Sequence, residues 1–166
     1  TVDGAISFNG ETNAGNDITA KGTNTGSISL AGNANAANNV TATTNTGMVT
    51  FNGYTTAETG SVTVTTVDGT ITFNGNTQAA QDVTATATNN GALTVTDGHT
   101  VNAGHDVTAT AKNGNIDFGG TVTATNLLKA TNENGDILFK GAASGADVTM
   151  ATQSGNISVT GDTTAT

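Results

Sequence analysis

A glycine-led phrase of seven residues returns about every 22 residues along the chain. Its opening glycines are residues 4, 26, 47, 69, 91, 114, 135 and 155. The copies read GAISFNG, GSISLAG, GMVTFNG, GTITFNG, GALTVTD, GNIDFGG, GDILFKG and GNISVTG. A repeat of this length is typical of solenoids, in which each unit forms one coil and buries its apolar side against its neighbours.

Apolar and polar residues alternate within each phrase, as in a β-strand with one buried face. All five phenylalanines of the protein occupy the second apolar position of the phrase. The first apolar positions are Ile6, Ile28, Val49, Ile71, Leu93, Ile116, Ile137 and Ile157, and the second are Phe8, Leu30, Phe51, Phe73, Val95, Phe118, Phe139 and Val159. This shared phase indicates that equivalent positions of successive repeats meet in the folded chain.

Another strand is predicted near the end of each repeat, in the segments DITAK, NVTAT, SVTVT, DVTAT, DVTAT, LLKAT and DVTMA. An alanine shortly before this strand, as at Ala14 and Ala36, indicates a short intermediate strand or a tight corner. Asn, Asp and Gly are frequent between this strand and the next repeat, and they accept the left-handed backbone of turns.

Two architectures are compatible with short strands and Asn-Gly corners. One is an antiparallel meander of hairpins, and the other is a solenoid whose strands pair in parallel with their own copies one coil later. Only the solenoid places Phe over Phe and Ala over Ala, at the inter-strand spacing of about 4.8 Å. The sequence therefore predicts an all-β fold, a right-handed parallel β-helix (β-solenoid) of about seven to eight coils. We expect residues 1–166 to form a single segment without caps, belonging to a longer rod or a stacked filament.

The composition limits the classes of function. With four lysines, no arginine and a net charge of −9, the chain lacks the basic face that nucleic-acid binding needs. No apolar run approaches the ~20 residues that cross a bilayer, so membrane insertion is not expected. The absence of cysteine excludes disulfides and thiolate metal sites. We expect no cofactor.

The segments AGNDITA (residues 14–20) and AGHDVTA (103–109) resemble the repeats of filamentous-haemagglutinin-type exoproteins, the two-partner-secreted adhesins of Gram-negative bacteria. DVTATAT (82–88) and GTITFNG (69–75) also resemble bacterial strand-repeat surface proteins. The resemblance covers nearly the whole chain as a style of repeat. It implies a rigid β-helical stalk or filament, extracellular and either secreted or attached to the cell surface, with a structural role in adhesion or extracellular matrix. The implied partners are neighbouring repeats, other copies end to end, and a host-cell, glycan or biofilm surface.

Outward Thr-x-Thr pairs form the first candidate site. They recur in four consecutive repeats, at Thr41, Thr43, Thr63, Thr65, Thr84, Thr86, Thr108 and Thr110. Such a ladder resembles the ice-binding face of some β-solenoid antifreeze proteins, so the alternative function is a module that binds ice or glycan. The other interpretation is that threonine simply suits the outer face of a strand. Lys21, Lys129 and Ala151 interrupt the ladder.

Acidic residues form the second candidate site. Asp82 and Asp106 occupy equivalent positions of adjacent coils, where two carboxylates would repel each other or attract a cation. The favoured interpretation is that each aspartate instead accepts hydrogen bonds from backbone amides at its corner. His99 and His105 lie near Asp97 and Asp106 in the longest repeat. The chain lacks the paired carboxylates and long loops of polysaccharide-cleaving solenoids, and we expect no catalytic activity.

Overall fold

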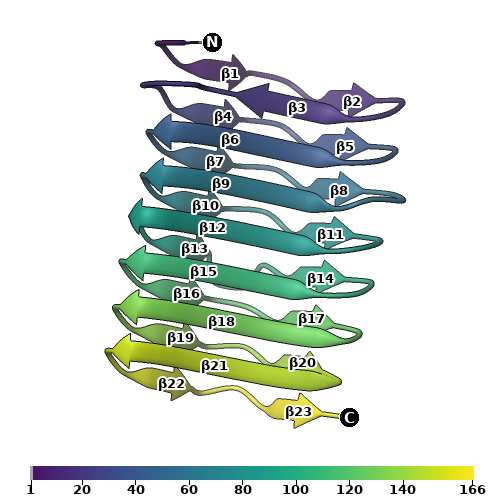
Figure 1. The fold of residues 1–166 in the computed structure, drawn as a ribbon. Coiled ribbons are helices and arrows are strands. Elements are labelled where there is room, and N and C mark those ends of the chain that lie inside the picture. Colours follow the sequence, from purple (N-terminus) through teal and green to yellow (C-terminus); the bar gives the residue numbers. More distant parts are fainter. Residues whose placement is uncertain (1) are drawn as a thin grey trace.

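The structure is a computed structural model that describes residues 2–166. These residues form 23 strands and no helix, wound into a solenoid of about seven turns. Each complete coil contributes three strands, and β22 and β23 begin an eighth coil. In Figure 1 the chain crosses the back from left to right, returns along the front and descends with each turn. This sense of winding is right-handed, as predicted.

Three parallel sheets make up the walls of the solenoid, because every strand pairs with the equivalent strand of the adjacent coils. The first sheet contains β1 (Ile6–Phe8), β4 (Ile28–Leu30), β7 (Val49–Phe51), β10 (Ile71–Phe73), β13 (Leu93–Val95), β16 (Ile116–Phe118), β19 (Ile137–Phe139) and β22 (Ile157–Val159). The second sheet contains β2 (Thr12–Ala14), β5 (Ala34–Ala36), β8 (Thr55–Ala57), β11 (Thr77–Ala79), β14 (Val101–Ala103), β17 (Val122–Ala124), β20 (Ala143–Gly145) and β23 (Thr163–Ala165). The third sheet contains the longer strands β3 (Ile18–Lys21), β6 (Val40–Thr46), β9 (Val62–Asp68), β12 (Val83–Asn90), β15 (Val107–Asn113), β18 (Leu127–Asn134) and β21 (Asp147–Ser154).

The phenylalanines stack in one column of the first sheet, as the repeat phase predicted. Phe51 pairs in register with Phe73, and their ring centroids lie 5.2 Å apart with planes 12° from parallel. Phe118 stacks on Phe139 with centroids 4.7 Å apart. Parallel pairing throughout the sheets excludes the antiparallel meander.

Two further inward columns were missed in the sequence because they mix polar and small residues. One lines the second sheet and consists of Thr12, Ala34, Thr55, Thr77, Val101, Val122, Ala143 and Thr163. The other lines the third sheet and consists of Thr44, Thr66, Ala87, Ala111, Asn132 and Thr152. In the third sheet, Thr44 Oγ1 donates to the carbonyl of Gly26 (2.8 Å) and Asn132 Nδ2 to that of Gly114 (2.7 Å). Each of these two side chains thus joins the end of its coil to the glycine that opened it.

The opening glycines stack on one another with positive φ angles. At Gly114 φ is 141°, and an added Cβ would lie 2.5 Å from the carbonyl oxygen of Gly91 in the preceding coil. Both the backbone conformation and this close approach therefore require glycine.

Candidate functional site

The outer face of the third sheet brings the predicted threonines together. One column is Thr41, Thr63, Thr84 and Thr108, and the other is Thr43, Thr65, Thr86 and Thr110, each in direct register across β6, β9, β12 and β15. The alternation of each strand sends these side chains outward, while the valines and alanines between them face the core.

The columns are longer than the Thr-x-Thr pairs of the sequence indicated. Thr19 and Thr149 belong to the first column, and Thr131 belongs to the second. They were missed because each stands alone in its repeat, without a second threonine two residues away. We call the eleven residues together the threonine face: Thr19, Thr41, Thr63, Thr84, Thr108, Thr149, Thr43, Thr65, Thr86, Thr110 and Thr131. Lys129 interrupts its first column, and Lys21 and Ala151 stand at the two ends of its second.

The inner threonines of this face are half-buried, since each packs between its neighbours in the column. The hydroxyls of Thr110 and Thr131 lie 3.4 Å apart. A β-branched side chain has few accessible χ1 rotamers, and the strands beneath are fixed by hydrogen bonds on both sides. The face is therefore a preordered array of methyl and hydroxyl groups.

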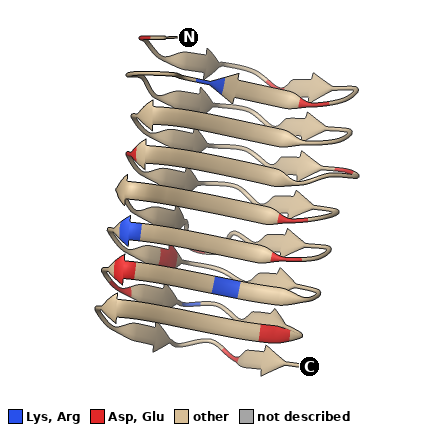
Figure 2. Ribbon diagram, viewed as in Figure 1, with Lys and Arg blue, Asp and Glu red and all other residues tan. Residues whose placement is uncertain are grey.

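Charge is distributed unevenly over the third sheet. Figure 2 shows that most of its acidic residues lie at the ends of strands, at the corners of the solenoid. Three of the four lysines of the protein belong to this sheet: Lys21 in β3, Lys112 in β15 and Lys129 in β18. Away from the corners, the outward residues of β6, β9 and β12 are uncharged.

Shallow open hollows accompany the second column. One, of about 400 Å³, extends over β12, β15, β18 and β21 between Thr110 and Lys112. Lys112 and Glu133 both line this hollow. Lys112 Nζ lies 3.9 Å from Glu133 Oε2, and both side chains are about half exposed. A second hollow of about 350 Å³ lies over β3, β6 and β9.

Asp82 and Asp106 stand in adjacent coils as expected, but each is engaged with the backbone. Asp82 Oδ1 accepts a hydrogen bond from the amide of Asp106 (3.1 Å), and Asp106 Oδ1 accepts one from the amide of Leu127 (3.1 Å). Asn39 Oδ1 likewise accepts a hydrogen bond from the amide of Ser61. Each aspartate thus accepts a hydrogen bond from a backbone amide, but the bonded amide belongs to the next coil and not to the corner of the aspartate itself.

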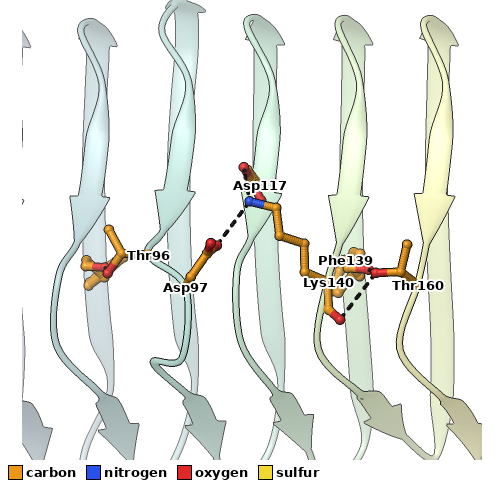
Figure 3. A network of polar contacts seen from close by, with 7 residues as sticks. Thr96, Asp97, Asp117, Phe139, Lys140 and Thr160 are labelled. Atoms are coloured by element: carbon orange, nitrogen blue, oxygen red, sulfur yellow. Dashed lines mark hydrogen bonds and ion pairs between the residues drawn. The ribbon is translucent and has the colours of Figure 1, made fainter.

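The longest repeat carries a small ionic network (Figure 3). Asp97 replaces the glycine that closes the phrase in the other repeats, and Gly98 turns the chain with a φ of 80°. Lys140 Nζ, two coils later, lies 3.0 Å from Asp97 Oδ1 and 3.2 Å from Asp117 Oδ2. The hydrogen bond to Asp97, followed by that to Asp117, raises the pKa of Lys140 above its ordinary value.

This network engages the carboxylate that the sequence placed near two histidines. Within residues 2–166, no group of three or more His, Asp or Glu side chains is positioned to hold a metal ion. Asp97 instead accepts a hydrogen bond from Lys140. The backbone amides of His99 and His105 donate hydrogen bonds to the carbonyls of Thr96 and Gln81.

Comparisons with known proteins add no relatives. No protein-family model matches the chain, and no similar curated protein or solved structure was found. The resemblance to filamentous-haemagglutinin-type repeats therefore stays a prediction. The described residues include no helix long and apolar enough to cross a membrane.

Proposed function

We propose that this chain is a rigid structural segment of a secreted or cell-surface repeat protein, acting as part of a stalk or filament in adhesion or extracellular matrix. The observation that carries the proposal is the parallel pairing of equivalent strands through all the coils in three continuous sheets. Such a rod is suited to hold another domain at a fixed distance, and its role requires no catalytic group.

Stiffness follows from the direction of the bonds. Backbone hydrogen bonds join each coil to the next, as from the amide of Val49 to the carbonyl of Thr70 (2.9 Å). Side chains such as Asp82 and Asp106 add bonds in the same direction. Seven inter-strand spacings in the first sheet give a rod roughly 34 Å long. Bending it would open spacings on one wall while the close-packed core resists compression on the other.

Self-association end to end, or with neighbouring repeats, is the partner interaction we propose. The inward residues Ile157 and Val159 of β22 are 45% and 36% exposed, whereas their partners Ile137 and Phe139 in the preceding coil are fully buried. Another coil, from the same chain or from a second copy, would cover these side chains and pair with the free strand edge. A net charge of −9 disfavours contact between the sides of two rods.

The extracellular location rests on the resemblance of the repeats, and it is tested on cells that make the protein. An antibody against this segment should label intact cells or their medium, and externally added protease should remove the cell-bound signal. Labelling that requires permeabilised cells would refute the location.

The spacer role is tested by changing the length of the rod. Deleting residues 47–90 removes two repeats and joins two equivalent corners, so the shortened chain should fold and lose about 10 Å of length in small-angle X-ray scattering. Deleting residues 47–79 instead leaves the repeats out of phase and should prevent folding. In the parent protein, the two-repeat deletion should weaken adhesion in proportion to the lost reach. Unchanged adhesion by a two-repeat deletion variant that is folded and measurably shorter would refute the spacer role.

A further inference from the structure

The threonine face differs from the other two outer walls of the solenoid. The outward column of the first sheet mixes residue types, with Thr72 and Thr94 followed by Asp117 and Leu138. The second sheet also presents a mixed column, as at Gln78 and Asn102. Among the described residues, only the third sheet carries two adjacent outward columns of one residue type across four consecutive coils.

We propose that the threonine face binds ice. A pocket for a single small molecule needs a few different polar groups converging in a concavity. A uniform array repeated at the inter-strand spacing of about 4.8 Å instead suits a ligand that is itself a repeating lattice. Each contact between a threonine and the lattice is weak, but contacts presented together on a rigid surface add without a separate entropic cost for each.

The rigidity of the face favours this ligand. The inner threonines are half-buried by their neighbours, and Thr110 and Thr131 contact each other through their hydroxyls. Restricted rotamers mean that little side-chain entropy is lost on binding. The methyl groups offer apolar surface to ordered water, and the hydroxyls donate and accept hydrogen bonds at fixed positions.

The charge pattern also favours a neutral lattice. Across β6, β9 and β12 the two columns contain only threonine, in a protein of net charge −9. Charged side chains would hold their own hydration shells and keep an ordered water lattice away. The described residues of the two columns include no aromatic side chain, so the face offers no flat ring on which a sugar could stack. These features favour ice over a polysaccharide surface.

The first experiment measures thermal hysteresis and ice-crystal shape with the purified chain, together with partition into a growing ice front. The wild type should show hysteresis, faceted crystals and enrichment in ice. Thr84→Lys places a charge at the centre of the face and should abolish most of the hysteresis. Thr72→Lys is the matched control, because Thr72 faces outward from the first sheet in the same coil. It should leave the hysteresis unchanged, and circular dichroism should show both variants folded.

A gain-of-function variant is also needed, because a loss of hysteresis could come from misfolding whereas a gain could not. Lys129 lies in register between Thr108 and Thr149, so Lys129→Thr makes the first column continuous over all seven strands. Its hysteresis should exceed that of the wild type at equal concentration.

Specific outcomes would overturn the proposal. A folded wild type without hysteresis or enrichment in ice would do so, as would equal hysteresis in the Thr84→Lys and Thr72→Lys variants. Adsorption to powdered cellulose or chitin that Thr84→Lys abolishes, without any activity on ice, would assign the face to a polysaccharide instead. None of these results depends on the spacer role, which the length variants test separately.

Discussion

Thr55 and Thr77 place two hydroxyl groups in the core, and removing these groups should stabilise the protein. Both side chains face inward from the second sheet, in register in adjacent coils, and each is 1% exposed. Neither Oγ1 atom has a hydrogen-bond partner among the described residues. Valine has nearly the same shape as threonine, and the same column already holds valine at Val101 and Val122.

The expected magnitude follows from the cost of an unsatisfied buried hydroxyl, which is about 1–3 kcal/mol. Thr55→Val and Thr77→Val should each raise the free energy of unfolding by about 1 kcal/mol, the low end of that range. For a chain of this size, 1 kcal/mol corresponds to about 2–4 °C in the melting temperature. The measurement is urea unfolding followed by circular dichroism, supported by calorimetry.

Thr44→Val is the matched control, because it makes the same chemical change at an equally buried site. The Thr44 hydroxyl is also 1% exposed, but it donates a 2.8 Å hydrogen bond to the carbonyl of Gly26. This variant should lose about 1–2 kcal/mol, since the carbonyl is left without its partner. The prediction is thus a difference in sign between two identical substitutions. If Thr55→Val and Thr77→Val destabilise the protein as much as Thr44→Val does, the hydroxyls in the second sheet have bonding partners and the reasoning is wrong.

Three further predictions concern the contacts between coils. Asp106→Ala should lower the free energy of unfolding, measured in urea, by about 1–3 kcal/mol, because it removes the acceptor of the Leu127 amide. Asp106→Asn keeps an acceptor oxygen and should retain most of the stability. Equal losses in the two variants would contradict this role. Gly114→Ala should prevent folding at 37 °C, because its Cβ would lie 2.5 Å from a carbonyl oxygen, whereas Gly15→Ala, with open space around it, should melt within a few degrees of the wild type. Because the pKa of Lys140 is raised, its ion pairs stabilise the fold below the ordinary lysine value of 10.5 and are lost as the pH rises through the higher folded value. Lys140→Met should therefore melt below the wild type at neutral pH and converge with it in strongly alkaline buffer; a constant difference across this pH range would refute the ionic role.

The sequence by itself determined the parallel solenoid, because the repeat is most regular at the positions whose side chains stack in columns. Phe51 and Phe73 share a phase of the repeat, and their rings stack in one column. The threonine pairs were likewise visible, since strand alternation fixes which residues point outward once the strand is known. The position of Asp82 and Asp106 in adjacent coils followed from the same phase.

Tertiary structure decided what the repeat pattern leaves ambiguous. Thr55, Thr77 and Asn132 are buried, although their polarity gave no sign of it, because they continue the inward alternation of β8, β11 and β18. The partner of Asp106 is an amide in the next coil, which no pattern within one repeat specifies. Lys140 reaches Asp97 across 43 residues, because two coils of winding bring the residues together. A periodic sequence reveals which residues lie above one another, but only the path of each coil sets how closely they approach and which polar groups they bond.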